Sequence, residues 1–224
     1  RPILTTSAVR TTMYELPPKG DVCTAQKEHC CFCFAVLRAS MGLSAIPQAD
    51  IPDAELNVPV FVSWYLENDA APQGKQLRGC IGTFEPHPLS QALQVYTIQS
   101  AWNDKRFEPI RPAELEKLQC TVSLLTPFEE CKDLFDWKMG VHGVYVSFVM
   151  PVGGQAMSTT ATFLPEIAPA QGWSKQETIV HAILKAGWSG QITDSFMRNV
   201  RLWRYKSTTA TATYKDFVAS PLHV

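Results

Sequence analysis

The sequence predicts an α+β protein with a substantially antiparallel sheet, and three observations favour this class. Segments that alternate apolar and polar residues, as half-buried strands do, lie among segments whose apolar residues recur every three or four positions, as on one face of a helix. These two kinds of segment do not alternate strictly, which argues against a parallel sheet. Glycine-containing turns at 71–74 and 153–154 connect expected strands, which is typical of antiparallel hairpins.

Four helices are expected from apolar periodicity and from residues that begin or end helices. The expected helices are Thr24–Met41, Pro88–Asn103, Pro112–Leu118 and Ser174–Ala186. The first has an apolar stripe formed by Cys30, Cys33, Phe34, Leu37 and Met41. The last begins with the sequence SKQE, a capping box in which Ser174 and Glu177 satisfy each other's backbone amides.

Six strands are expected from β-branched and aromatic residues and from a period of two. The expected strands are Val58–Leu66, Gln76–Phe84, Gln119–Thr126, Val144–Phe148, Met157–Leu164 and Asn199–Lys206. Ser207–Thr213 (STTATAT) is expected to be a low-complexity polar connection before Tyr214–Ser220. Residues 1–22 are interpreted as an extended or mobile lead-in, 23–220 as one domain for which a division into two subdomains is left open, and 221–224 as a C-terminal tail.

Composition excludes several classes of protein. Twenty Lys and Arg residues against 21 Asp and Glu give a net charge of -1, so no global field attracts nucleic acid or a membrane surface. The longest apolar run, Cys30–Leu37, is far shorter than the roughly 20 residues that a spanning helix needs. Seven irregularly spaced cysteines argue against a disulfide scaffold and favour reduced thiols in the cytoplasm or nucleus. Residues 1–20 contain no apolar stretch of a secretory signal.

Leu77–Thr83 (LRGCIGT) is the most unusual stretch of the chain. Alternate residues of a strand share a face, so Arg78, Cys80 and Gly82 are expected to point away from the core, with the first two side chains ~6–7 Å apart. A nearby cation stabilises a thiolate and lowers the pKa of a cysteine. Glycines such as Gly79 and Gly82 mark places in a strand where a ligand approaches the backbone closely. The segment therefore predicts a small anion-binding cleft with Cys80 as a potential nucleophile.

A second interpretation of the same segment is purely structural. Free cysteine is among the residue types that are most often buried, so Cys80 would be a small core residue. The glycines would then be bulges or positions of tight packing. Residue type alone favours this interpretation.

The LRGCIGT segment is also the hallmark of the AMMECR family, which this chain resembles. Other segments similar to the family's eukaryotic branch follow in the same order: 30–37 (CCFCFAVL), 100–109 (SAWNDKRFEP), 121–126 (TVSLLT), 140–143 (GVHG), 160–166 (TATFLPE), 171–173 (QGW) and 192–205. The resemblance covers residues 22 to 218 and implies an α+β fold with a larger and a smaller subdomain. It also implies that the hallmark segment lies near a cleft between them.

The resemblance implies no settled activity. Bacterial relatives occur beside, or fused with, a Memo-like protein and a radical-SAM protein, which implies a shared pathway in those organisms. The eukaryotic members lack that arrangement.

Two further segments contain candidate site residues. Asp104 and Arg106 follow the second expected helix, and Arg106 is predicted to bind a carboxylate or phosphate together with Arg78. The alternative is a solvated Asp104–Arg106 turn, or an arginine that connects two segments. His142, at the start of an expected strand, is a candidate proton shuttle for Cys80, the alternative being a structural, hydrogen-bonded histidine.

Metal and cofactor sites are not predicted. Cys30 and Cys33 lack the second ligand pair that a structural zinc site needs, and they continue an apolar stripe, as Cys120 does on its strand. The glycine-rich nucleotide motifs and the serine-hydrolase motif do not occur in the sequence.

The C-terminal basic and aromatic residues form no single platform for nucleic acid. Arg201, Trp203 and Tyr205 are expected on one strand face, and Arg204 and Lys206 on the other. Nucleic-acid binding is therefore unfavourable but stays an alternative.

The leading functional hypothesis is a cleft that binds a small anionic ligand or an acidic segment of a partner protein, in an adaptor or scaffold. In the enzymatic alternative, Cys80 is the nucleophile, His142 the proton shuttle, and Arg78 and Arg106 the anion clamp. In the remaining alternative, the protein binds RNA or another single-stranded nucleic acid.

Overall fold

The computed structural model describes residues 16–68, 71 and 74–223. It has an α+β fold with antiparallel strands, as predicted, and these strands form two four-stranded sheets. The chain divides into two compact units, a larger one comprising Pro18–Phe128 and Lys206–Val224, and a smaller one built on Glu129–Tyr205. Of the expected lead-in, residues 1–15 lie outside the described part, and 16–22 form neither helix nor strand.

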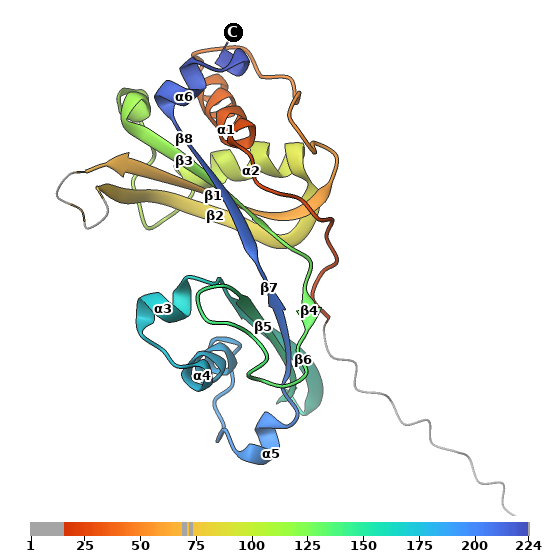
Figure 1. Ribbon diagram of the computed structural model, residues 1–224. Helices are drawn as coiled ribbons and strands as arrows, with labels where there is room; N and C mark the ends of the chain where they lie inside the picture. Colours follow the sequence, from red (N-terminus) through yellow and green to blue (C-terminus); the bar gives the residue numbers. More distant parts are fainter. Residues whose placement is uncertain (1–15, 69–70, 72–73, 224) are drawn as a thin grey trace, which may run out of the picture. The chain divides into compact units, whose positions relative to one another are not determined.

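The larger unit places its helices on one face of a sheet with the strand order β2-β1-β3-β8. Its elements are α1 (Lys27–Ser40), β1 (Asn57–Glu67), β2 (Lys75–Pro88), α2 (Leu89–Trp102), the 3₁₀ helix η1 (Pro112–Lys117), β3 (Leu118–Leu125), β8 (Ser207–Thr213), α6 (Tyr214–Val218) and the 3₁₀ helix η2 (Pro221–His223). Helix α2 packs on β1 and β2, and α1 packs on β3 and β8 (Figure 1). Strand β2 is therefore an edge strand with α2 on one face.

The core of this unit lies between the sheet and the two long helices. Strand β1 directs Val58, Val60, Val62 and Trp64 into it, and each of these side chains is fully buried, as the period of a pleated strand requires. Nine successive residues of α1, His29–Leu37, are also buried, which explains its long apolar run.

The cysteines of α1 and β3 belong to this core, as predicted. Cys30, Cys33 and Cys120 are fully buried. Burial, followed by hydrogen bonds with Cys30 and Cys33, raises the pKa of the Cys120 thiol far above its ordinary value. These thiols are structural and unsuited to nucleophilic chemistry.

The smaller unit contains a second antiparallel sheet with the strand order β4-β7-β5-β6. Its elements are β4 (Glu129–Glu130), β5 (Gly143–Val152), β6 (Gln155–Phe163), α3 (Ile167–Gln171), α4 (Lys175–Lys185), α5 (Asp194–Met197) and β7 (Arg201–Tyr205). Helix α4 packs on β5 and β6 and begins with the predicted capping box, in which the Glu177 amide donates to Ser174 Oγ at 3.2 Å.

Some elements differ from the sequence-based expectation. Ser207–Thr213 is strand β8, because its alanines alternate with β-branched threonines, and Ala212 is buried while Thr211 is exposed. The elements β4, α3 and α5 were not predicted, since two to five residues are too few to display a period. Part of the predicted tail forms η2.

Candidate functional site

The LRGCIGT segment forms the middle of β2, and its glycines lie where neighbouring backbone approaches closely. A Cβ atom on Gly79 would lie 1.9 Å from the carbonyl oxygen of Ser100 in α2. A Cβ atom on Gly82 would lie 2.2 Å from the carbonyl oxygen of Val60 in β1. The geometry thus supports tight packing at both glycines, and it gives no support to their expected role as open ligand-binding backbone.

Arg78 connects β2 to the segment that follows α2, rather than facing a cleft. Its Nε donates to Glu114 Oε1 at 2.9 Å and its Nη2 donates to Pro109 O at 3.1 Å, while Nη1 donates to Glu108 O. The Arg78 and Glu114 side chains are only 12% and 14% exposed. Nη2 also donates to Glu114 Oε2 at 3.3 Å, so four donor contacts occupy this guanidinium. The prediction that Arg78 clamps an anion together with Arg106 is therefore corrected.

The same ion pair sets the protonation of Glu114. Burial raises the pKa of its carboxyl, but hydrogen bonds from Arg78 and Arg111 outweigh burial, so the net pKa lies below the ordinary value. Glu114 therefore remains ionised as the partner of Arg78.

Cys80 lies on the sheet face opposite to the helices. It pairs with Ser63 of β1, whose neighbours Val62 and Trp64 point into the core. The Ser63 hydroxyl donates a hydrogen bond to Cys80 Sγ at 3.1 Å. Cys80 is half-buried, and it is not part of a disulfide bond. The predicted orientation of Cys80 away from the core is confirmed.

Asp104 lies in the turn after α2 and binds the backbone of Cys80. Its Oδ2 accepts from the Cys80 amide at 2.9 Å and from Arg106 Nη2 at 2.7 Å, and its Oδ1 accepts from Arg106 Nε at 2.9 Å. These hydrogen bonds, first of all those from the Arg106 side chain, hold the pKa of the Asp104 carboxyl well below its usual range. Asp104 is 7% exposed and is therefore a buried, ionised anchor.

Arg106 is the cation that accompanies Cys80. Its Nη2 also donates to the Cys80 carbonyl at 3.1 Å, and its side chain is 60% exposed. Asp104 raises the pKa of Arg106, and the charge of the Cys80 thiolate acts in the same direction. The structure thus brings Cys80, Asp104 and Arg106 together, and Arg106 rather than Arg78 is the cation that contacts the backbone of Cys80.

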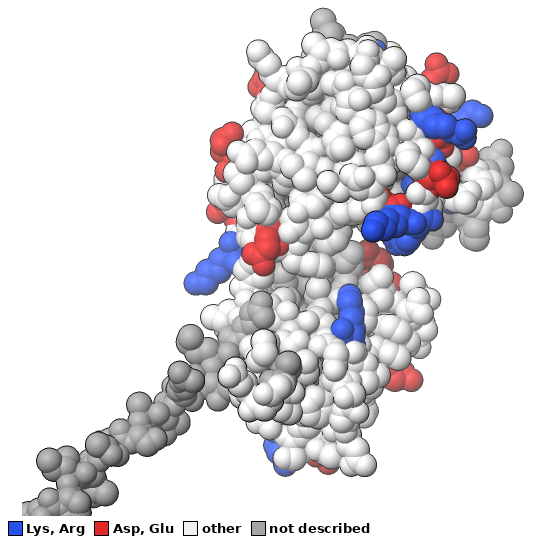
Figure 2. All heavy atoms as spheres, turned by 180° about the vertical axis from the view of Figure 1, so that it is seen from behind, with Lys and Arg blue, Asp and Glu red and all other residues white. Residues whose placement is uncertain are grey.

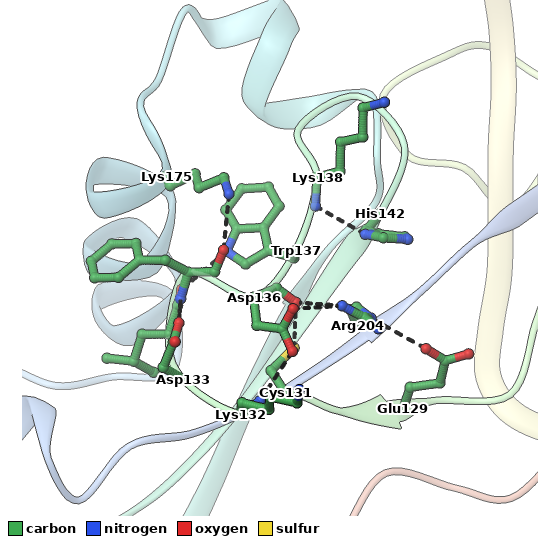
Figure 3. Close-up of polar contacts among 12 residues, drawn as sticks. Glu129, Cys131, Lys132, Asp133, Asp136, Trp137, Lys138, His142, Lys175 and Arg204 are labelled. Carbon is green, nitrogen blue, oxygen red and sulfur yellow. Dashed lines mark hydrogen bonds and ion pairs between the residues drawn. The ribbon is translucent and has the colours of Figure 1, made fainter.

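His142 belongs to the smaller unit, where its ring is part of a turn. Its Nδ1 accepts a hydrogen bond from the Lys138 amide at 2.9 Å, as the dashed line in Figure 3 shows. This contact is the one expected for a structural histidine. The proposed proton transfer between His142 and Cys80, which belong to different units, stays a prediction.

The basic and aromatic residues of β7 are engaged within the smaller unit. Arg201 pairs with Glu130. Arg204 pairs with Glu129 and Asp136, as Figure 3 shows. Trp203 is 4% exposed and thus unsuited to stacking on a base. On the face shown in Figure 2, basic side chains are scattered and several lie beside acidic ones, so this face presents no continuous basic surface.

Two features are absent from the residues that the structure describes. No group of three or more His, Cys, Asp or Glu side chains there is arranged to hold a metal ion. No helix in the same part of the chain is long and apolar enough to cross a membrane.

Sequence reasoning missed two residues of the region. Ser63, which contacts the Cys80 sulfur, could have been found from the strand register, because residues directly opposite each other share a face. Glu114 could not have been found from the sequence, since it lies 36 residues from Arg78 in a short 3₁₀ helix.

Fold and site together define an α+β domain of two antiparallel sheets, with a thiol and an exposed arginine brought together at an edge strand. The chain belongs to the AMMECR1 family, whose sequence model matches residues 30–210, which confirms the resemblance. It is 38% identical over 197 residues to the uncharacterized Arabidopsis thaliana protein At2g38710, covering 88% of this chain and 89% of that protein.

Other relatives agree with this assignment. An uncharacterized protein of Schizosaccharomyces pombe is 35% identical over 196 residues, which cover 86% of this chain and 95% of the relative. The crystal structure of the uncharacterized Pyrococcus horikoshii protein PH0010 is similar with a TM-score of 0.62 at 25% identity, covering 83% of this chain and 90% of that one. The names of these relatives describe no activity.

Proposed function

We propose that this chain binds an anionic group, a carboxylate or a phosphate, at the site formed by Cys80, Asp104 and Arg106. One observation carries the proposal: the Arg106 guanidinium is held by Asp104 and by the Cys80 carbonyl, yet its side chain is 60% exposed. Its Nη1 makes no hydrogen bond within the described structure, so donors remain for a planar anion. Because the side chain is already fixed, binding costs little additional rotamer entropy.

The anion has two sources that share this chemistry. One is a small ligand, and the other is an acidic segment of a partner protein, for which the chain would act as an adaptor. None of the seven cysteines forms a disulfide bond, which fits the reducing cytoplasm or nucleus that the sequence predicts.

Calorimetric titrations with inorganic phosphate and with a hexaglutamate peptide test the proposal and distinguish the two sources. We expect Arg106→Ala to lower the affinity for the anion tenfold or more, because it removes the exposed guanidinium. Lys105→Ala is the matched control, since it removes an exposed cation one residue away. Equal binding by the two variants, or no saturable binding of either probe to the wild-type chain, would overturn the proposal.

A second candidate function is cysteine chemistry at the same position, in which Cys80 acts as a nucleophile. The Ser63 hydrogen bond to the Cys80 sulfur and the neighbouring Arg106 charge favour it, since both stabilise a thiolate. In this candidate function, His142 is the residue proposed to supply or accept the proton.

Alkylation by iodoacetamide, followed at each cysteine by mass spectrometry between pH 6 and 9, tests this candidate. The Cys80 thiolate would form a carbon–sulfur bond and release iodide, and we expect this reaction at lower pH than at Cys131. Burial raises the pKa of the Cys131 thiol to about 11, so this thiol reacts slowly in this pH range and is the matched control. If both cysteines react at the same rate, or if Arg106→Ala leaves the Cys80 profile unchanged, the nucleophile role is excluded.

A further inference from the structure

The smaller unit contains a pocket that is separate from the Cys80 site. It has a volume of about 440 Å³ and lies between the loop at 131–135 and the segment at 197–202. Pockets that hold small molecules have volumes of roughly 300–1,000 Å³ and a mostly apolar lining with a few polar groups. This volume is therefore suited to a small organic ligand.

One wall of the pocket is held in place by hydrogen bonds. Cys131 Sγ donates to Asp136 O at 3.2 Å, the Lys132 amide donates to Asp136 Oδ2 at 3.2 Å, and Arg204 Nη1 donates to Asp136 Oδ1 at 2.8 Å (Figure 3). Farther along the loop, the Phe135 amide donates to Asp133 Oδ1 at 2.7 Å. This bracing makes the wall a preformed surface, so a ligand does not have to order the loop when it binds.

The lining combines an apolar surface with charged groups. Its apolar residues are Leu134, Phe135, Met197, Val200 and Leu202. Val200 and Leu202 are buried, whereas Phe135 is 49% exposed. An apolar chain or ring that enters the pocket would be removed from water against these side chains.

The charged lining residues favour an anion. Lys132, Arg198 and Arg201 are basic, and Glu130 and Asp133 are acidic. Arg201 pairs with Glu130, so these two charges compensate each other. Lys132 and Arg198 form no ion pair within the described part of the chain, and both are exposed. Asp133 offsets one of these two positive charges, so the net charge of the lining is positive.

We propose that this pocket binds a small amphipathic anion, namely an apolar chain or ring that carries one carboxylate or phosphate. The apolar part contacts Leu134, Met197 and Leu202, and the charged group lies within reach of Lys132 or Arg198. This site belongs to a different unit from the Cys80 site and does not depend on the function proposed for that site.

Octanoate and octanamide are matched probes for this pocket, because they share a chain and differ in charge. We expect octanoate to bind saturably at one site per chain in calorimetric titrations, and octanamide to bind at least tenfold more weakly. Octanoate should also slow the alkylation of Cys131, which lines the pocket. Equal affinity of the two probes, or unchanged alkylation of Cys131 at saturating octanoate, would overturn the proposal.

Charge variants test the location of the bound carboxylate. The double variant Lys132→Ala/Arg198→Ala removes two exposed side chains, so the fold is expected to persist, and octanoate should bind about tenfold more weakly. Lys138→Ala is the control, because it removes an exposed cation of the same unit that does not line the pocket. A loss of the same size in Lys138→Ala, or no loss in the double variant, contradicts the assigned pocket.

Discussion

The Asp104 carboxylate accepts a hydrogen bond from the backbone amide of Cys80 at 2.9 Å. The turn after α2 is thereby attached to the edge strand β2 at the residue that presents the thiol. Arg106 completes the connection by donating to the carbonyl of the same residue. Both backbone polar groups of Cys80 are thus held by one turn, so the orientation of the thiol depends on Asp104.

We therefore expect Asp104→Ala to destabilise the protein. The substitution leaves the Cys80 amide without its acceptor and Arg106 without its counterion, and an unsatisfied buried donor costs about 1–3 kcal/mol. Urea denaturation measures the loss in the free energy of unfolding. Glu116→Ala removes an exposed carboxylate of the same unit and should change it by less than about 0.5 kcal/mol. Equal stability of the two variants would show that the contact with Cys80 contributes little.

The free energy of unfolding is expected to decrease as the pH is lowered in the acid range. The ion pair with Lys27 and the hydrogen bonds from Thr213 lower the pKa of Asp216 from 3.8 to about 2, and the pKa of Asp104 is lowered further. A carboxyl whose folded pKa lies below its unfolded value stabilises the fold above the unfolded pKa and loses this effect as pH falls through the folded pKa. The loss should therefore extend from about pH 4 down to about pH 2.

Asp216→Asn tests this dependence, because it removes the titrating group and keeps its size. We expect the free energy of unfolding, measured by urea denaturation between pH 2 and 7, to depend less on pH in this variant than in the wild type. Glu116→Gln is the control that should leave the slope unchanged. An unaltered slope in Asp216→Asn would mean that the Lys27–Asp216 pair is not maintained in solution.

The candidate site was partly predictable, and strand geometry explains the limit. The period of two correctly directed Cys80 away from the core, because β2 is regular at that residue. It failed for Arg78, because the pairing of Trp64 with Gly79 and of Tyr65 with Leu77 leaves Arg78 without an opposite residue. Such an irregularity redirects a side chain and has no signature in the sequence here. The partner that then receives Arg78, Glu114, comes from a distant short element.

For the fold, amino-acid composition led to one wrong prediction, that of the segment that forms β8. Ser207–Thr213 contains only small and hydroxyl residues, so hydrophobic patterning gave no strand, whereas β8 is stabilised by its pairing with β3. Hydrophobic patterning thus identified the elements that have an apolar face. It missed β8, whose formation depends on pairing with the neighbouring strand.

Arg78→Lys is expected to lower stability without weakening the anion site. Lysine keeps the charge but cannot reproduce the fork that contacts Glu114 and two carbonyls, so we expect a loss of about 1–3 kcal/mol in urea denaturation. Arg111→Lys, at a side chain that is 80% exposed, should cost less than about 0.5 kcal/mol. Phosphate affinity of the folded Arg78→Lys variant should match that of the wild type. A large loss of affinity would restore Arg78 as a ligand-binding residue.

Gly79→Ala should disturb both the fold and the site, because it separates β2 from α2. The added Cβ atom would lie 1.9 Å from Ser100 O, a backbone atom that moves only with its helix. Overpacking of this kind costs about 1–3 kcal/mol, which urea denaturation would detect. The turn with Asp104 and Arg106 follows directly from α2, so a shift of the helix should also weaken phosphate binding severalfold. Glu85→Ala, an exposed substitution in the same strand, is the control for both measurements. If Gly79→Ala is as stable as Glu85→Ala, then the close approach of β2 to α2 at this residue is absent in solution.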